Sequence, residues 1–268
     1  MNTIQISIES NEEQQEILIS QLLDLDACGF EQIENGLIAY FDENIFRSHE
    51  VNDLLKNYSF SLKVIEEKNW NEEWERNFQP IIVNQFCAIR AEFHPPVTDV
   101  EYDIIITPKM SFGTGHHATT YMMIEQMGAI DFKNKVVFDF GTGTGILSIL
   151  SEKLGAYKIE AIDVDEWSIS NARENIEKNH CTKISLNLSS QIPTVKFDVI
   201  LANINRNIIL DYLPILSQSL KDNGHLLLSG LLESDKGDII IACVTQNLKP
   251  VKPAERNGWI SLLFIKAL

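Results

Sequence analysis

The sequence predicts an α/β protein with a mostly parallel sheet, preceded by a small α+β domain of the split βαβ (ferredoxin-like) type. From residue 136 onward, apolar strand-like runs alternate with amphipathic helix-like stretches, which is typical of a parallel sheet covered by helices on both faces. Residues 1–65 instead follow a β-α-β-β-α-β order, that of a split βαβ module. A glycine-rich stretch directly after the strand Val136–Phe140 indicates where a ligand would bind.

The N-terminal domain is expected over residues 1–65. Ile4, Ile6 and Ile8 alternate with polar residues, as in a half-buried strand. Asn35-Gly36 between two apolar runs is a strong hairpin signal. The expected elements are strand Asn2–Ile8, helix Glu12–Leu25, strands Phe30–Glu34 and Leu37–Phe41, helix Val51–Lys56 and strand Phe60–Ile65. Because this domain contains no obvious catalytic group, we expect it to hold a partner.

Residues 66–79 are expected to form a connecting helix. The segment is polar and free of glycine, and Trp70, Trp74 and Phe78 recur at a spacing of four. This spacing places the three aromatic rings on one helical stripe. We therefore expect the stripe to dock on the larger domain; substrate stacking by a tryptophan is the alternative.

Residues 80–268 are expected to form the larger domain. The expected strands are Ile81–Val83, Phe86–Arg90, Asp103–Ile106, Val136–Phe140, Ile159–Asp163, Ile184–Leu188, Phe197–Ala202, His225–Leu231 and Trp259–Lys266. The expected helices are Tyr121–Met127, Ile146–Leu154, Trp167–Asn179, Ile208–Leu220 and Asp238–Gln246, and Asn223-Gly224 is expected to end the fourth of them. In such sheets ligands bind outside the carboxyl ends of the strands, where Gly141, Asp163 and Asn203 fall.

The glycine-rich stretch has the pattern D-x-G-x-G-x-G, from Asp139 to Gly145. Glycines allow turn conformations that other residues resist and let a ligand approach the backbone, and the following helix start favours negative charge. Asp163 ends the next strand, where its carboxylate can accept both hydroxyls of a ribose. A dinucleotide-binding turn would instead read G-x-G-x-x-G, and an ordinary tight turn would lack the acid.

A second loop, Pro108–Thr120, packs glycines, threonines and an aromatic residue before the helix Tyr121–Met127. Such a loop is costly to order unless a ligand uses it. His116 and His117 do not predict a metal site, because neighbouring side chains seldom point the same way and no H-E-x-x-H completes one. Thr119 or Thr120 is the expected N-cap of the helix.

The formal net charge of −16 argues against direct nucleic-acid binding and favours a basic protein partner. The sequence has no run of about 18 apolar residues, and its N-terminus lacks a leader pattern, so we expect a cytoplasmic protein. The four cysteines form no C-x-x-C pair, so we expect reduced, mostly buried thiols and no metal.

Taken together, four motifs resemble those of the bacterial ribosomal protein L11 methyltransferases. They are N-W-x-x-x-W-x-x-x-F-x-P at Asn69–Pro80, P-x-M-x-F-G-T-G-x-H-x-T-T at Pro108–Thr120, D-F-G-x-G-x-G at Asp139–Gly145 and A-N-I at Ala202–Ile204. The third is similar to motif I of class I methyltransferases. The resemblance covers the chain from about Trp70 to its end, and the second motif is the most specific.

The resemblance implies a Rossmann-like class I methyltransferase domain with a seven-stranded sheet over residues 80–268, and a substrate-recognition domain over residues 1–65. S-adenosylmethionine would be the cofactor and S-adenosylhomocysteine the product. The residues implied to hold the cofactor are Thr120, Gly141, Asp163 and Asn203, with Thr114, Asp139 and Gly143 in the two cofactor loops. Phe112 would lie near the reacting methyl group. The substrate would be a basic large-subunit ribosomal protein, methylated on lysine and N-terminal amines by a monomeric enzyme.

For catalysis we expect Asn203 to act with Ile204 and Phe112. The Asn203 side-chain oxygen and the Ile204 carbonyl would accept hydrogens from the amine and direct its lone pair at the methyl group. The simpler alternative is that Asn203 caps a turn after its strand. Asp139 is expected to hold loop amides and not to act as a base.

Two other functions are compatible with parts of the sequence. An adenine, glutamine or small-amine methyltransferase would share the cofactor site, but those adenine and glutamine enzymes typically carry N-P-P-Y, whereas Ile204-Asn205 stand here and no aromatic residue occurs at Arg206 or Asn207. A non-catalytic scaffold would show decay of a cofactor motif, and none is visible.

Overall fold

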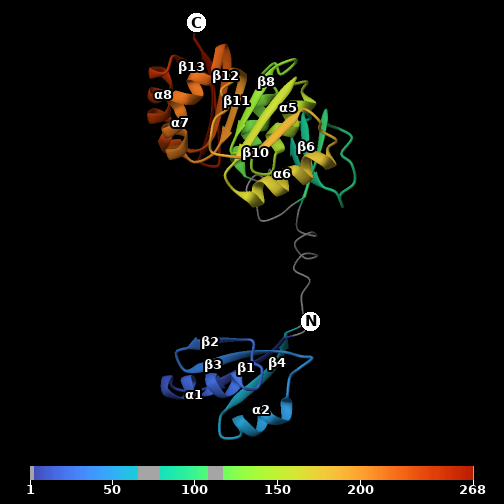
Figure 1. Cartoon of the computed structure of the whole chain (residues 1–268), viewed down its shortest axis with the longest axis vertical. Coiled ribbons are helices and arrows are strands. Elements are labelled where there is room, and N and C mark those ends of the chain that lie inside the picture. Colours follow the sequence, from blue (N-terminus) through green and yellow to red (C-terminus); the bar gives the residue numbers. More distant parts are fainter. Residues whose placement is uncertain (1–2, 66–78, 108–116, 268) are drawn as a thin grey trace. The chain divides into compact units, whose positions relative to one another are not determined.

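The computed structural model describes residues 3–65, 79–107 and 117–267 (Figure 1). The chain divides into two compact units, Met1–Asn77 and Phe78–Leu268. We call them the N-terminal unit and the C-terminal unit and describe each by itself. The predicted aromatic stripe of the connecting helix and most of the loop that follows Thr107 lie outside the described residues.

The N-terminal unit is a four-stranded antiparallel sheet in the order β2-β3-β1-β4 with two helices. Its elements are β1 Thr3–Glu9, α1 Glu12–Leu23, β2 Gly29–Ile33, β3 Gly36–Asp42, α2 Ser48–Leu55 and β4 Phe60–Ile65. Ile4, Ile6 and Ile8 are buried in its core with Leu18 and Leu22 of α1. The predicted β-α-β-β-α-β order is therefore confirmed.

The C-terminal unit contains a three-stranded and a seven-stranded sheet. The smaller sheet consists of β5 Ile81–Val83, β6 Cys87–Ala91 and β7 Tyr102–Ile106. The remaining elements are α4 Ala118–Met127, β8 Val136–Phe140, α5 Ile146–Lys153, β9 Lys158–Asp163, α6 Glu166–Lys178, β10 Ile184–Leu188, β11 Phe197–Asn203, α7 Arg206–Ser219, β12 Leu220–Leu232, η1 Glu233–Asp235, α8 Lys236–Thr245, β13 Leu248–Arg256 and β14 Trp259–Lys266.

The large sheet has the strand order β10-β9-β8-β11-β12-β14-β13. The first five strands are parallel, whereas β14 runs antiparallel to both of its neighbours. The chain proceeds from β8 outward to β10, and then returns to place β11 on the other side of β8. This reversal makes the carboxyl ends of β8 and β11 the expected place for a ligand. The seven-stranded, mostly parallel sheet confirms the predicted fold class.

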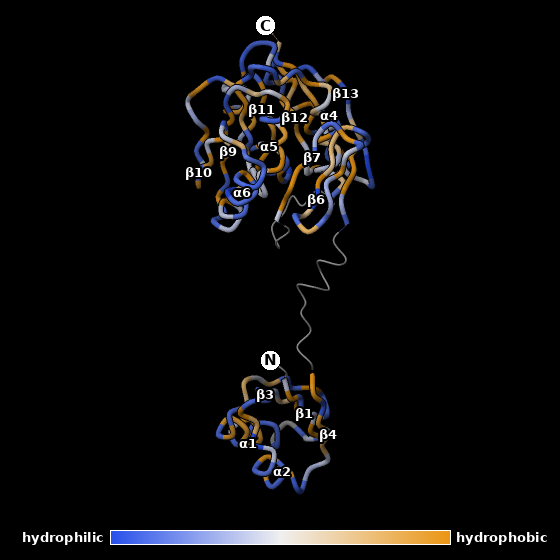
Figure 2. The backbone as a smooth tube through the Cα atoms, turned by 90° about the vertical axis from the view of Figure 1, so that its right-hand side faces the viewer, coloured by the Kyte–Doolittle hydropathy of each residue, from blue (hydrophilic) through white to orange (hydrophobic). Residues whose placement is uncertain are grey.

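Each face of the large sheet has its own hydrophobic core. Val137 belongs to the core shared with α4 and α5, whereas Phe138, the next residue of β8, belongs to the core shared with α7 and α8. Alternate residues of a strand point to opposite faces, which is why β8 is apolar on both faces except at Asp139. Figure 2 shows the hydrophobic residues concentrated around β11, β12 and α5 and the hydrophilic ones toward the periphery.

Two details of the C-terminal unit differ from the sequence predictions. β13 was not expected, because Pro250 and Pro253 interrupt its pattern; it is an edge strand, where proline is tolerated, and its register shifts between them. Asn223-Gly224 does not end α7. The partner of β11 changes from Leu220 to His225 within two residues of β11, so the turn is an irregularity inside β12.

The thiols and the helices add two observations. Cys87 and Cys243 are buried, Cys181 is partly buried and Cys28 is exposed, and all four are free. Within residues 3–65, 79–107 and 117–267, no helix combines the length and apolar character needed to cross a membrane.

Candidate active site

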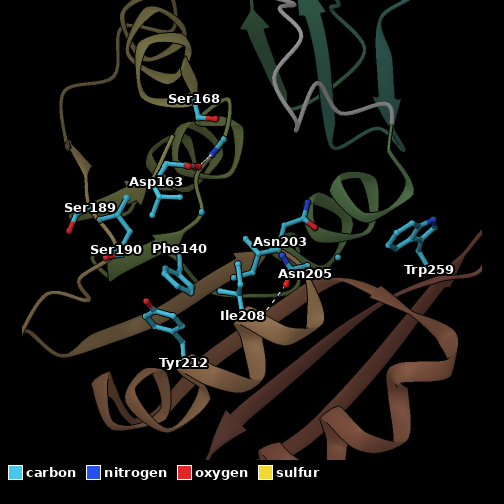
Figure 3. A pocket seen from close by; sticks show the side chains of 16 residues that line it. Phe140, Asp163, Ser168, Ser189, Ser190, Asn203, Asn205, Ile208, Tyr212 and Trp259 are labelled. Carbon is cyan, nitrogen blue, oxygen red and sulfur yellow. Dashed lines mark hydrogen bonds between the residues drawn. The ribbon is translucent and has the colours of Figure 1, made fainter. Parts of the chain in front are cut away.

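A cavity of about 640 Å³ opens at the carboxyl ends of β8, β9 and β11 (Figure 3). Its volume falls in the range of roughly 300–1,000 Å³ that is common for small-molecule sites. Gly141, Gly143, Asp163, Asn203 and Ile204 all line it. The structure thus brings together five residues that the sequence assigned to the site.

The glycine loop, residues 141–145, follows β8 and forms one wall of the cavity. Gly141, Gly143 and Gly145 have φ angles of 76°, 55° and 79°, in the left-handed region that favours glycine. A β-carbon on Gly141 would lie 2.4 Å from Cγ2 of Ile204. Alternate glycines are therefore required both by the backbone conformation and by the close approach of the segment after β11.

Asp139 lies behind this loop and does not line the cavity. Its Oδ2 accepts hydrogen bonds from the hydroxyls of Thr142 at 2.7 Å and Ser148 at 2.6 Å. Burial raises the pKa of Asp139 to about 6, although the hydrogen bonds from Ser148 and Thr142 oppose the rise. The observed side-chain partners are hydroxyls that hold the loop to α5, which supports a structural task for this carboxylate.

Asp163 ends β9 beside the glycine loop. Its Oδ2 accepts from the Gly143 amide at 2.9 Å, and its Oδ1 accepts from the Asp165 amide at 3.0 Å. These bonds fix the orientation of the carboxylate, which also lines the cavity. A carboxylate oxygen accepts more than one hydrogen bond, so Asp163 can still receive ligand hydroxyls.

Asn203 ends β11 and carries an unusual polar atom. Its Nδ2 donates to Oγ1 of Thr120 at 3.3 Å, whereas its Oδ1 is buried and has no hydrogen-bond partner in the part of the chain that the structure describes. An unsatisfied buried acceptor costs about 1–3 kcal/mol. The sequence analysis gave capping of the turn after β11 as the alternative role for Asn203. In the structure Asn205 is the cap there, since its side chain accepts from the Ile208 amide at the start of α7.

Two glycines lie close to Ile204. Besides Gly141, Gly230 of β12 lies against it, and a β-carbon there would be 2.2 Å from the Ile204 carbonyl oxygen. Gly230 has a φ of 83° and also lines the cavity. The sequence analysis did not select Gly230, although an isolated glycine inside a strand can indicate close backbone approach.

Aromatic rings complete the cavity. Phe140 and Tyr212 lie next to each other with ring centroids 5.0 Å apart, and Figure 3 shows Trp259 well away from them. Trp259 packs edge-on against the His117 ring, with centroids 4.6 Å apart. The sequence did not reveal Tyr212 or Trp259 as site residues, because each belongs to an element with its own core pattern.

The N-cap of α4 differs from the predicted one. The N-cap is His117, not Thr119 or Thr120, and its side chain accepts from the Thr119 amide. Thr120 is fully buried in the first turn of α4. Among the described residues, no three His, Cys, Asp or Glu side chains gather as a metal site would require. Phe112, Thr114 and His116 lie outside the described residues.

Comparisons with known proteins agree with these features. The family model described as ribosomal protein L11 methyltransferase (PrmA) matches residues 2–267. The ribosomal protein L11 methyltransferase of Phocaeicola vulgatus is 37% identical over 247 residues, which is 88% of each chain. That of Porphyromonas gingivalis is 36% identical over 260 residues, covering 93% of this chain and 90% of the relative.

A solved structure gives the same result. The crystal structure of a ribosomal protein L11 methylase from Lactobacillus delbrueckii subsp. bulgaricus superposes with a TM-score of 0.66 at 30% identity. The match covers 71% of this chain and all of that one. The family predicted from the four motifs is confirmed, and the chain belongs to the ribosomal protein L11 methyltransferase (PrmA) family.

Proposed function

We propose that this protein transfers methyl groups from S-adenosylmethionine to lysine side-chain and N-terminal amino groups of ribosomal protein L11. The observation that carries the proposal is the buried, unpartnered Oδ1 of Asn203 beside the glycine loop. This atom can accept a hydrogen bond that only a bound molecule or residues outside the described ranges can donate. The names of the relatives supply the substrate.

The residues present fit S-adenosylmethionine in chemistry and size. Gly141 and Gly143 let the backbone approach the ligand, and the Asp163 carboxylate suits the two ribose hydroxyls. Thr120 orients the Asn203 amide through the bond to its Nδ2. When bound, the cofactor would supply an electrophilic methyl group on sulfur. The protein then has to align an amine with that group and exclude water.

The acceptor amine has to arrive neutral. A lysine amine has a reference pKa of about 10.4, so only about one in 2,500 is neutral at pH 7. We propose that Oδ1 of Asn203 accepts a hydrogen bond from the neutral amine and so directs the nitrogen lone pair at the methyl group. The Ile204 carbonyl, which lies close against Gly230, is the second proposed acceptor. Phe112 and Thr114 remain predicted neighbours of the methyl group.

Charge supports a basic protein substrate for the N-terminal unit. Residues 1–65 contain twelve acidic and only three basic side chains. This segment therefore carries a net charge of −9 of the total of −16. An acidic domain attracts a basic protein and increases its rate of association. We propose that residues 1–65 bind the substrate and that residues 80–268 carry out the transfer.

The test is transfer of radiolabelled methyl groups to ribosomal proteins from cells that lack this enzyme. Label on amines of L11, located by peptide mapping, is the expected result. Label in RNA or in small amines would keep the cofactor site and reject the substrate. Cofactor binding without any transfer would instead favour a scaffold.

A further inference from the structure

Asn175 of α6 joins two segments of the C-terminal unit that are far apart in the sequence. Its Nδ2 donates to the carbonyl oxygen of Thr144 at 2.8 Å, and its Oδ1 accepts from the amide of Thr107 at 2.7 Å. The side chain is fully buried. Thr144 belongs to the glycine loop, whereas Thr107 directly follows β7. One side-chain amide therefore fixes the glycine loop relative to the end of β7.

Asn179, one helical turn later, offers a natural comparison. Its Oδ1 accepts from the Ile105 amide at 3.0 Å, and its Nδ2 donates to the Ile105 carbonyl oxygen at 2.6 Å. The two asparagines thus satisfy backbone groups two residues apart along β7, as a neighbouring strand would. Both asparagines hold α6 to the small sheet. Of the hydrogen bonds described for these two side chains, the one that reaches the glycine loop comes from Asn175.

Thr107 has other attachments that do not involve Asn175. Its hydroxyl donates to Oε1 of Glu174 at 2.6 Å and accepts from Nζ of Lys178 at 2.8 Å. The end of β7 therefore stays connected to α6 if the Asn175 side chain changes. The bond to the Thr144 carbonyl connects this assembly to the cavity wall.

The position of the glycine loop affects the wall of the cavity. Gly141 and Gly143 line the cavity directly, and the loop ends at Gly145, where a β-carbon would lie 3.2 Å from Cβ of Ala172 on α6. A displacement of the Thr144 carbonyl therefore moves residues that lie against the ligand. Misplacement by about 1 Å of groups that orient a substrate can reduce the rate on the order of a hundredfold.

We propose that Asn175 is a positioning residue for S-adenosylmethionine, which holds the glycine loop in its binding conformation through the Thr144 carbonyl. Asn175 touches neither the cofactor nor the amine in this proposal. The inference rests on the proposed function, because it takes the glycine loop as the cofactor site.

The experiment compares Asn175→Ala, Asn175→Asp and the control Asn179→Ala in the full-length protein. Asn175→Asp keeps an acceptor for the Thr107 amide; once ionised it has no donor for the Thr144 carbonyl, whereas a protonated carboxyl would donate to it, so binding is measured from about pH 7 to about pH 9. Binding of S-adenosylmethionine is measured by titration calorimetry, and thermal unfolding is recorded for each variant. KM values for the cofactor and the protein substrate are measured separately.

We expect both Asn175 variants to weaken cofactor binding about tenfold, as loss of one buried hydrogen bond would. KM for the cofactor should rise while KM for the protein substrate stays unchanged. Asn179→Ala should lower the melting temperature at least as much and bind the cofactor like wild type. Equal cofactor affinities for Asn179→Ala and the Asn175 variants would overturn the inference, and so would wild-type affinity in Asn175→Asp at the alkaline end of the pH range, where its carboxyl is ionised.

Two further outcomes separate this inference from the proposed function. If the wild-type protein does not bind S-adenosylmethionine, the proposed function itself fails. If Asn175→Ala does not yield folded protein, the comparison of Asn175→Asp with Asn179→Ala decides the question alone.

Discussion

The side-chain amide of Asn203 is held by the Thr120 hydroxyl at 3.3 Å, which leaves its buried Oδ1 aimed at no donor among the described residues. The two residues come from β11 and α4, which are 83 positions apart. Because the Thr120 hydroxyl accepts from Nδ2, the oxygen Oδ1 is the atom of the Asn203 amide that stays without a partner among the described residues. Asn203 is thereby prepared to accept a hydrogen bond and not to donate one.

Replacement of Asn203 by Ala should therefore reduce turnover more than cofactor affinity. We expect kcat to fall roughly a hundredfold, as for removal of a group that positions or stabilises the reacting atoms, and the cofactor dissociation constant to change by less than about tenfold. Single-turnover methylation and calorimetry measure the two quantities. Asn207→Ala, at an exposed position, is the control. Equal losses in the two measurements would leave Asn203 only a cofactor ligand.

Gly230→Ala should be strongly destabilising and should also impair catalysis. The new β-carbon would lie 2.2 Å from the Ile204 carbonyl oxygen, and the φ of 83° resists any side chain. We expect a loss of unfolding free energy of more than about 2 kcal/mol in urea denaturation. Gly237→Ala is the matched control, because a β-carbon in α8 would meet nothing within 4 Å. That change should be neutral or stabilising by roughly 0.5–1 kcal/mol.

Asp139 should make folding less favourable as the pH rises from about 4 to about 6. Its folded pKa is raised to about 6 by burial, whereas an unfolded Asp titrates near about 3.9. Between these values the folded state binds more protons, so the stability contributed by this group falls with rising pH and is constant above the folded pKa. The total effect is of the order of 3 kcal/mol.

Asp139→Asn removes this dependence, and the other carboxyl groups cancel when the two proteins are compared. The difference in unfolding free energy between wild type and variant should change between pH 4 and 6 in favour of the variant and then level off. Urea denaturation at intervals of pH measures it. A difference that does not vary with pH would show that folding does not raise the pKa of Asp139.

Asp163→Asn should weaken cofactor binding without a large loss of stability. The change removes a charge that suits ribose hydroxyls and keeps an acceptor for the Gly143 amide, while the exposed Asp165 amide loses its acceptor to the new side-chain NH2 group. We expect a loss of affinity of about 10- to 100-fold and a loss of stability of about 1 kcal/mol. Asp165→Ala provides the contrast. Its side chain caps α6 by accepting from the Ser168 amide at 2.9 Å, so the loss should be about 1 kcal/mol of stability, with cofactor affinity preserved. Calorimetry and thermal unfolding distinguish the two.

The sequence by itself determined the family, the order of most elements and the positions of the glycine loop, Asp163 and Asn203. These features are local: a strand shows its alternation, and a glycine loop after a strand needs no distant partner to be recognised. It missed β13, whose prolines are tolerated only because that strand lies at an edge of the sheet. It also placed the cap of α4 two or three residues late, since a histidine can supply the same acceptor as a threonine.

Only the tertiary structure decided how distant residues share the site. Gly230 meets the Ile204 carbonyl because β12 lies beside β11, and Asn175 reaches both Thr107 and Thr144 because α6 packs against the end of β7 and the glycine loop. The free oxygen of Asn203 is likewise set by Thr120. A lone glycine in a strand can indicate a close backbone approach, but the sequence does not identify the partner, because a hydrogen bond or a close approach depends on the distance between atoms and not on their separation along the chain.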